Sequence, residues 1–300
     1  MYYAPLIGIT KAILIPTGTH VLQLENGTEE KSCIWSTENG NLVFKRVIVE
    51  GKREKQEINP PNPYQRMNSH SLQTIKYYNA TQNKIKFYFA PKTHPVLDNP
   101  NTLIEFLQEP LTVAIKIQGL AAHTTPKDIP EWLIELSKRY DKPFIIHTDY
   151  LDTNVIWVNE EISHLIRNNS PYMWAKWAKE KGVRAYLAHG LRLDPQAADV
   201  VNNSNNLMVG LGPDILLGKE QERLAIKNQN YLETLFNLVD ENKITFSTDY
   251  RWNVFNRDKW DDLDWKTHER IIAYANKRGK NKSFLLKIFH ENAENFFRID

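Results

Sequence analysis

The stretch Pro143-Phe144-Ile145-Ile146-His147 sets the pattern that decides the fold of this chain. Its three consecutive large apolar residues form a run that is too short for a helix and too apolar for a surface strand. Such a run is typical of a strand buried on both faces of a parallel sheet. The run ends in a histidine, so a polar group stands directly at the carboxyl end of the predicted strand.

Six further runs of the same kind lie along the chain, at residues 11–16, 85–89, 112–117, 184–189, 206–211 and 244–249. Helical patterns separate them. Ser170-Pro171 and Asp194-Pro195 each combine a capping residue with a first-turn proline, and Gly182 stands where the helix begun at Ser170 should end. Apolar residues recur at helical spacing from Pro126 to Tyr140 and predict one helix there. Repeated βα units of this kind predict an α/β fold, a TIM-like (β/α)8 barrel.

Residues 20–66 break this rhythm. Apolar and polar residues alternate there, and the pairs Asn26-Gly27 and Asn39-Gly40 are typical turn sequences. We therefore expect a β-hairpin insertion over one barrel mouth, followed by a helix from about Tyr64 to Asn79. The chain is interpreted as a single barrel domain, residues 1–300, with its insertion at about 20–66.

Bulk composition narrows the classes of function. The 38 basic and 36 acidic residues leave a formal charge of +2 and are mixed along the chain, so we expect a small-molecule substrate and no nucleic acid. No apolar run approaches the roughly 20 residues of a membrane span, and the start of the sequence lacks a signal pattern. A single cysteine, Cys33, excludes an internal disulfide and a thiolate metal cluster. Together these features predict a cytoplasmic protein without a membrane partner.

Three predicted strands end in side chains that carry acid–base or metal chemistry: His147, His189 and Asp249. The carboxyl ends of parallel strands meet at one rim of a barrel, so these groups are expected to form one site. Two histidines and a carboxylate, each at a separate strand end of one barrel, therefore favour a functional site.

In the order and spacing of these motifs the chain resembles the amidohydrolase superfamily, most closely the amidohydrolase-2 branch related to aminocarboxymuconate semialdehyde decarboxylase. The matching phrases are GITKAILIP (8–16), VAIKIQG (113–119), PFIIHTD (143–149), YLAHG (186–190), ITFSTDY (244–250) and ENAENFF (291–297). The resemblance implies a metal-dependent hydrolase of a small ester, lactone or amide, or a lyase that decarboxylates or hydrates a carboxylic acid. It makes His147 and Asp249 ligands of a divalent metal, first of all zinc, and gives proton transfer to Asp249 and His189.

Other polar residues follow the predicted strands and complete the expected site. Lys116 and Arg251 are cations that could hold a substrate carboxylate, or else form structural ion pairs. His123 is assigned to substrate binding, and His20 is a further candidate metal ligand. The alternative for His20, His94 and His123 is that each is a loop histidine that bonds to the backbone or to water.

One element of the family pattern is missing, because the chain contains no His-x-His pair of the kind that ends the family's first strand. The sequence begins late, the protein lacks that strand, or another segment replaces it. Catalytic zinc usually has three protein ligands, so His147 and Asp249 alone predict weak metal binding. This leaves open the alternative of a non-catalytic degenerate barrel that acts as a binding or assembly protein. Open strand edges in an incomplete barrel predict a homodimer or an ordered hairpin plug.

Overall fold

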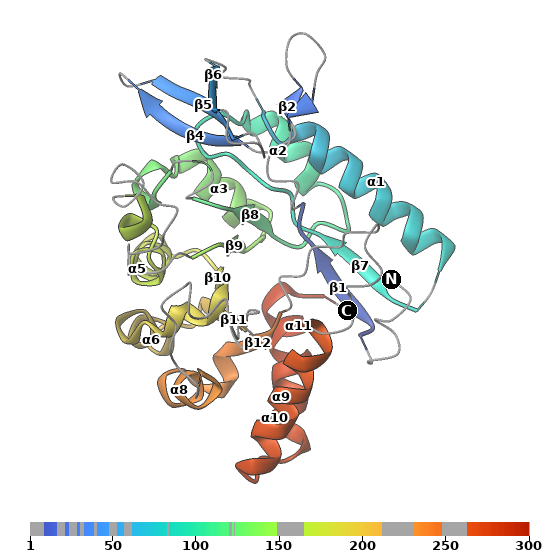
Figure 1. The fold of residues 1–300 in the computed structure, drawn as a ribbon. Coiled ribbons are helices and arrows are strands. Elements are labelled where there is room, and N and C mark those ends of the chain that lie inside the picture. The colour runs from blue at the N-terminus through green and yellow to red at the C-terminus, as the bar shows by residue number, and fades with distance from the viewer. Residues whose placement is uncertain are drawn as a thin grey trace. The chain divides into compact units, whose positions relative to one another are not determined.

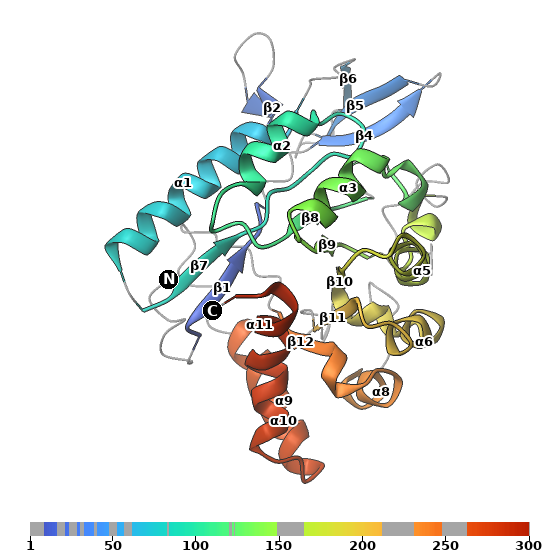
Figure 2. The ribbon, with the colours of Figure 1, turned by 180° about the vertical axis from the view of Figure 1, so that it is seen from behind.

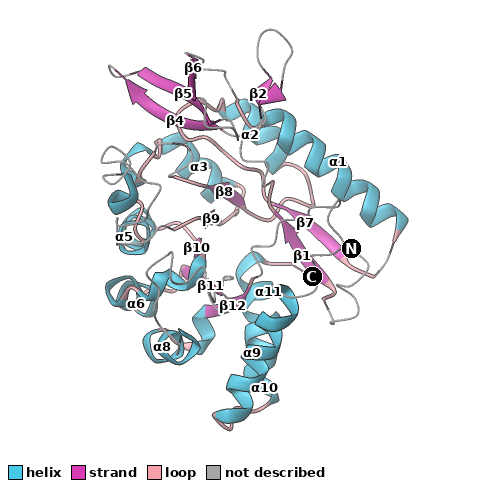
Figure 3. Cartoon of the chain, in the orientation of Figure 1, coloured by secondary structure: helices cyan, strands magenta, loops and turns pink. Residues whose placement is uncertain are grey.

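In the computed structural model, parallel strands and helices alternate from residue 65 to residue 246 (Figures 1 and 3). The structure describes residues 9–16, 22–23, 29–30, 33–38, 41–47, 53–56, 62–82, 84–119, 122, 124–148, 165–211, 231–247 and 263–299. The chain divides into two units, residues 1–144 and residues 145–300. Each unit is described by itself.

The first unit is built on a short parallel sheet. Strands β1 (Lys11–Leu14) and β7 (Lys86–Phe89) pair in parallel, from Lys11 opposite Lys86 to Leu14 opposite Phe89. Beyond β7, parallel bridges join Phe89 to Thr112 and Lys92 to Lys116, which lies in β8 (Ile115–Ile117). Three of the predicted strands are thereby confirmed, although the four residues of β1 are half-buried and not buried as predicted. Helix α1 (Gln65–Thr81), also predicted, packs against β7 and runs along the β1–β7 pair (Figures 1 and 2).

The helix expected from Pro126 to Tyr140 is wrong in its first part. Residues Pro126–Asp128 form a single 3₁₀ turn, and helix α3 begins only at Glu131 and ends at Arg139. Pro130 causes the break, because a residue that precedes proline avoids the helical conformation. Ile129 accordingly has an extended backbone, with ψ at 113°. The preceding helix, α2 (Pro100–Leu107), starts normally, with the Asn99 side chain accepting from the Asn101 N–H.

The β-hairpin structure predicted within residues 20–66 is confirmed and is larger than one hairpin. Strands β2 (Leu22–Gln23) and β3 (Glu29–Glu30) form an antiparallel pair. Strands β4 (Cys33–Glu38), β5 (Asn41–Val47) and β6 (Arg53–Gln56) form a three-stranded antiparallel sheet. In the β4–β5 register Glu38 stands opposite Asn41, as expected for a hairpin with the predicted turn pair between them. The position of this insertion over a barrel mouth stays a prediction.

The second unit contains the other four predicted strands. They are β9 (Phe144–Ile146), whose first residue closes the first unit, β10 (Ala185–Leu187), β11 (Leu207–Leu211) and β12 (Ile244–Phe246), and they lie in this order in the sheet. Strands β10, β11 and β12 pair in parallel. All residues of β9, β10 and β11 are buried, which agrees with the apolar runs that predicted them.

The helices of the second unit start and stop at the predicted signals. Helix α5 (Pro171–Lys181) is capped by the Ser170 hydroxyl, which accepts from the Met173 N–H, and it ends at Gly182 with φ at 60°. Helix α6 (Pro195–Asn202) is capped by the Asp194 carboxylate. The remaining helical elements are α8 (Tyr231–Leu238), α9 (Leu263–Lys277), α10 (Lys282–Leu286), a π turn (Lys287–Glu291) and α11 (Asn292–Phe297). Among the helices in the described ranges, none has the length and apolar character needed to cross a membrane.

These pairings establish a mixed α/β fold with parallel sheets. Closure into an eight-stranded barrel and the single-domain organisation stay predictions.

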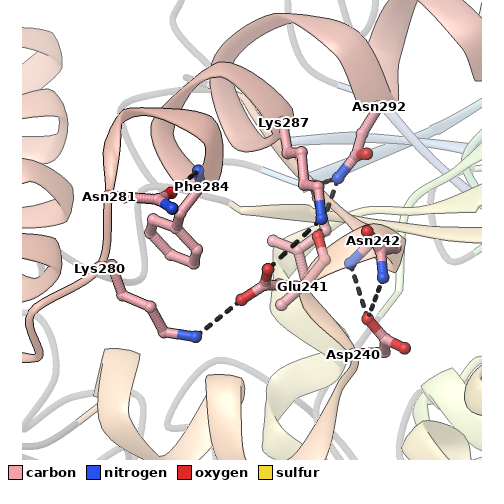
Figure 4. Close-up of polar contacts among 9 residues, drawn as sticks. Asp240, Glu241, Asn242, Lys280, Asn281, Phe284, Lys287 and Asn292 are labelled. Atoms are coloured by element: carbon pink, nitrogen blue, oxygen red, sulfur yellow. Dashed lines mark hydrogen bonds and ion pairs between the residues drawn. The ribbon is translucent and has the colours of Figure 1, made fainter.

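The amino end of β12 is tied to the C-terminal helices by a charged cluster around Glu241 (Figure 4). The Glu241 carboxylate accepts from Lys280 Nζ at 2.7 Å and lies 3.5 Å from Lys287 Nζ. Asn292 Nδ2 donates to the carbonyl oxygens of Glu241 and Ile244, at 2.8 and 2.7 Å. The Lys280 hydrogen bond is the main cause of a lowered pKa at Glu241. Because the folded pKa is the lower one, this contribution to stability is present at neutral pH and is lost as the pH falls through the carboxyl range.

Gly210 is required by its neighbour across the sheet. A Cβ atom at this position of β11 would overlap the hydroxyl and ring of Tyr186 from β10. The Tyr186 hydroxyl is held in place, since it accepts a hydrogen bond from Thr245 Oγ1 at 3.1 Å. The space beside Gly210 is therefore already filled by a fixed aromatic ring.

We predict that Gly210→Ala lowers the free energy of unfolding by about 1–3 kcal/mol, the usual cost of overpacking a core. Urea unfolding followed by circular dichroism measures it. The same substitution in a Tyr186→Ala background is the control and should cost much less, because the overlapping ring is gone. An equal cost in both backgrounds would show that Tyr186 is not the cause.

Candidate functional site

Two of the predicted site residues lie together in the second unit. His147 follows β9 directly, and His189 follows β10 after Ala188. His189 Nε2 and His147 Nδ1 are 2.9 Å apart and share a hydrogen bond, with the rings nearly perpendicular at a centroid distance of 4.4 Å. Residues 42 positions apart in sequence are thus joined directly, as the strand-end pattern predicted.

The backbone and side chains around the two imidazoles hold them in place. Ala188 N–H donates to the Ile146 carbonyl at 3.0 Å, which sets the register of the two strand ends. Thr148 Oγ1 donates to the Ala188 carbonyl at 2.8 Å. Arg192 Nε donates to the Thr148 carbonyl at 3.1 Å, so each strand end is bonded to the segment that carries the other histidine.

The chain leaves His189 in a left-handed turn. His189, Gly190, Leu191, Arg192 and Leu193 all have positive φ, between 50° and 65°. Left-handed backbone costs a non-glycine residue roughly 1–2 kcal/mol, and such residues concentrate at functional sites. Gly190 is needed for a second reason, because a Cβ there would overlap the hydroxyl of Tyr231 from α8. The buried side chain of Leu191 anchors the turn in the core.

The geometry of the pair determines its proton chemistry. A hydrogen bond between two neutral imidazoles needs one ring to donate and the other to accept. One further proton gives an imidazolium–imidazole pair, in which the same hydrogen bond becomes charge-assisted. His189 is only 5% exposed, whereas His147 is half-buried, so the His147 ring is the more accessible point of proton exchange. Imidazole exchanges protons near neutral pH, so the pair is suited to general acid–base work.

Comparison with known proteins gives little beyond this geometry. No family model matches the chain, and no curated protein matches it. Among solved structures, the chain is similar to the crystal structure of a "Putative 2-Pyrone-4,6-Dicarboxylic Acid Hydrolase" from Pseudomonas putida. The two share 12% sequence identity over 78% of each chain, with a TM-score of 0.47.

The other predicted site residues fall into two groups. Asp249, Arg251, His20 and His123 lie outside the described residues, so their assignments stay predictions. Lys116 is described and lies in β8 of the first unit, where it is 9% exposed. His94, also in the first unit, is fully buried, and its Nδ1 accepts from the N–H groups of Val96 and Leu97 at 3.3 and 3.2 Å. The interpretation of His94 as a loop histidine bonded to the backbone is therefore confirmed.

The described residues do not fit a metal site by themselves. No group of three or more His, Cys, Asp or Glu side chains within the described ranges is placed to hold a metal ion. In the His147–His189 pair, each ring already uses one nitrogen on the other ring. Catalytic zinc usually takes three protein ligands, and the described pair supplies at most two. No catalytic step is therefore assigned to a metal.

Sequence reasoning missed two residues that the structure makes prominent. Thr148 shows no special sequence pattern, and only its contact with Ala188, 40 positions away, gives it a role. Lys92 lies three residues beyond β7, in the phrase APKTH, and is 1% exposed. The one sequence signal for Lys92 was its place three residues after a predicted buried strand. Lysine is almost never fully buried without a partner, so a lysine at such a place is unusual.

We predict that Thr148→Val lowers the free energy of unfolding by about 1–2 kcal/mol, because valine keeps the shape but leaves the half-buried Ala188 carbonyl without its hydroxyl donor. The imidazole NMR signals of His147 and His189 should shift in this variant. Thr148→Ser is the matched control, since it retains the hydroxyl and should leave both signals in place. Unchanged signals in Thr148→Val would mean that Thr148 does not position the pair.

Proposed function

We propose that the chain is a hydrolase of the amidohydrolase type that acts on a small ester, lactone or amide, or a lyase of the same branch that decarboxylates or hydrates a carboxylic acid. The observation that carries the proposal is the 2.9 Å hydrogen bond between His147 and His189, which come from two adjacent strand ends. Both reaction classes need a group that takes and returns a proton, and histidine is the side chain that most often does this. The resemblance of the sequence motifs to the amidohydrolase superfamily supports both reaction classes equally.

In the hydrolytic reaction His147 acts as the proton acceptor. This role requires the tautomer in which His147 Nδ1–H donates to His189 Nε2 and His147 Nε2 carries the lone pair. A water oxygen attacks the substrate carbonyl carbon as its proton passes to His147 Nε2. His189 stabilises the resulting imidazolium through the charge-assisted bond, and His147 then returns the proton to the leaving oxygen or nitrogen.

The remaining assignments complete the proposal. Asp249 is the carboxylate that assists proton transfer. The resemblance also assigns Asp249 and His147 to a divalent metal, with His20 as a further candidate ligand; His147 would bind it through Nε2, so metal binding and proton uptake are alternative states of this ring. Lys116, Arg251 and His123 bind the substrate, for which a carboxylate group is the natural anchor of the two cations. These assignments rest on the sequence.

We predict that His147→Ala, His189→Ala and Asp249→Asn each lower kcat by about 10²–10⁴-fold, the usual contribution of a general acid or base. A panel of small esters, lactones and amides, together with an assay of CO₂ release from small carboxylic acids, measures turnover. His290→Gln is the matched control, because His290 is an exposed histidine paired with Glu294 at 3.2 Å. Equal turnover in His189→Ala and His290→Gln would refute the role of the pair.

A second candidate function, a non-catalytic binding or assembly protein, is favoured by one observation: the absence of a three-ligand metal group within the described ranges. Metal content separates the two functions. We expect less than one equivalent of zinc per chain after gel filtration in metal-free buffer, uptake of zinc when it is added, and reduced uptake in His147→Ala. Elemental analysis and a zinc titration measure both quantities. One tightly held equivalent would contradict weak binding and exclude the non-catalytic alternative.

A further inference from the structure

Two lysines lie side by side at the carboxyl end of the first unit's parallel sheet. Lys116 N–H donates to the Pro91 carbonyl at 2.8 Å, and Thr93 N–H donates to the Lys116 carbonyl at 2.9 Å. These two bonds place Lys92 directly opposite Lys116 in a parallel bridge. Paired residues on neighbouring strands share a face of the sheet, so both side chains leave the backbone on the same side. Lys92 is 1% exposed and Lys116 is 9% exposed.

The backbone of Lys92 is fixed by a side chain of α1. Asn68 Nδ2 donates to the Lys92 carbonyl at 2.8 Å, and Lys92 N–H donates to Asn68 Oδ1 at 2.9 Å. This pair of hydrogen bonds to one side-chain amide fixes the backbone of Lys92 beyond β7. Both bonds use backbone atoms of Lys92, so they position its side chain without occupying its amine.

Among the described residues, the neighbours of the Lys92 amine are the neutral side chains of Gln118 and Tyr64 and the cation of Lys116. Lys92 Nζ donates to Gln118 Oε1 at 2.8 Å and lies 4.7 Å from the centre of the Tyr64 ring. His94 stacks on the Tyr64 ring, with the two ring centres 6.2 Å apart. The carboxylate of Asp98 is engaged elsewhere, since it accepts from Thr93 Oγ1 and from the His94 N–H at 3.1 and 2.8 Å.

These surroundings change the charge state of Lys92. Burial, and secondly the charge of Lys116, lower the pKa of Lys92 to about 7. About half of the Lys92 amines are then uncharged at neutral pH, whereas fewer than about one in a thousand ordinary lysines are. A desolvated lysine beside a second cation is the usual form of a nucleophilic amine.

We propose that Lys92 is a covalent binding site for a small oxo-carboxylic acid: its amine forms a Schiff base with the substrate carbonyl while Lys116 binds the carboxylate. The proposal shares Lys116 with the proposed function and otherwise uses a separate set of residues in the first unit. The chemical class follows from the pair, because one neutral amine and one adjacent cation match a carbonyl carbon and an adjacent anion.

The atoms of this step balance without a further reagent. The Lys92 nitrogen bonds to the carbonyl carbon, and a proton moves from nitrogen to oxygen to give a carbinolamine. The carbinolamine loses water and leaves the imine, which takes up a proton to become an iminium ion. Water reverses the step. The iminium carbon attracts the electrons of neighbouring bonds, which is the activation required to break a bond next to the former carbonyl.

Reductive trapping tests the proposal directly on the full chain. The probe is glyoxylate, which carries an aldehyde beside a carboxylate, with cyanoborohydride to make the adduct permanent. Peptide mass spectrometry then measures the rate of modification at each lysine. We expect Lys92 to react at pH 7 at least about tenfold faster than exposed lysines, with a rate that rises as the pH increases through 7 and then levels off, because deprotonation is complete there.

Variants and a second probe separate the two lysines. Lys92→Arg keeps a cation but removes the nucleophile and should abolish this adduct. Lys116→Met should slow labelling by glyoxylate about tenfold, which corresponds to the loss of one ion pair of about 1.4 kcal/mol. It should slow labelling by formaldehyde less, because formaldehyde has no carboxylate. Circular dichroism verifies that each variant is folded, and the pH profile of the wild-type chain needs no variant.

Two results would overturn the proposal. Adducts confined to exposed lysines, with Lys92 unmodified at every pH, would show that Lys92 does not form a Schiff base. Equal slowing with both probes in Lys116→Met would show that Lys116 does not bind the carboxylate of the substrate. Trapping requires no turnover, so its failure is distinct from a failure of the hydrolase proposal.

Discussion

The hydrogen bond from the Ala188 N–H to the Ile146 carbonyl, 3.0 Å long, is the contact on which the candidate site depends. Side chains alternate between the two faces of a strand, so a shift of one residue between β9 and β10 would send His147 and His189 to different places. The buried residues of both strands prevent such a shift, because every one of them would lose its packing. Register is therefore the link between the apolar runs and the meeting of the two imidazoles.

The elements that the sequence predicted are those with local signals. All seven apolar runs are strands, and the caps at Ser170 and Asp194 begin helices, because burial and capping depend on neighbours in sequence. The expected helix from Pro126 was wrong because the apolar spacing continued through Pro130, and proline overrides periodicity. The hairpin insertion was recognisable from its alternation, although its number of strands was not.

The candidate site was predictable only in part. The strand-end rule brought His147 and His189 together correctly, and this is the part of the site for which a general rule of parallel sheets exists. The role of Thr148 and the state of Lys92 depend on partners far away in sequence, namely Ala188 and Lys116. Such pairings are products of the folded chain, and no local pattern contains them. The left-handed turn after His189 was missed for the same reason, since only one of its five residues is a glycine.

The two hydrogen bonds between the Asn68 amide and the Lys92 backbone affect which substitutions this chain can accept. The Asn68 amide forms two hydrogen bonds with the backbone of Lys92 and none with its side chain. The path of the backbone there therefore does not depend on which side chain is present. Evolution or design can therefore place another reactive side chain at position 92. The strand, the helix and Lys116 keep their places, because the two hydrogen bonds to the backbone are retained.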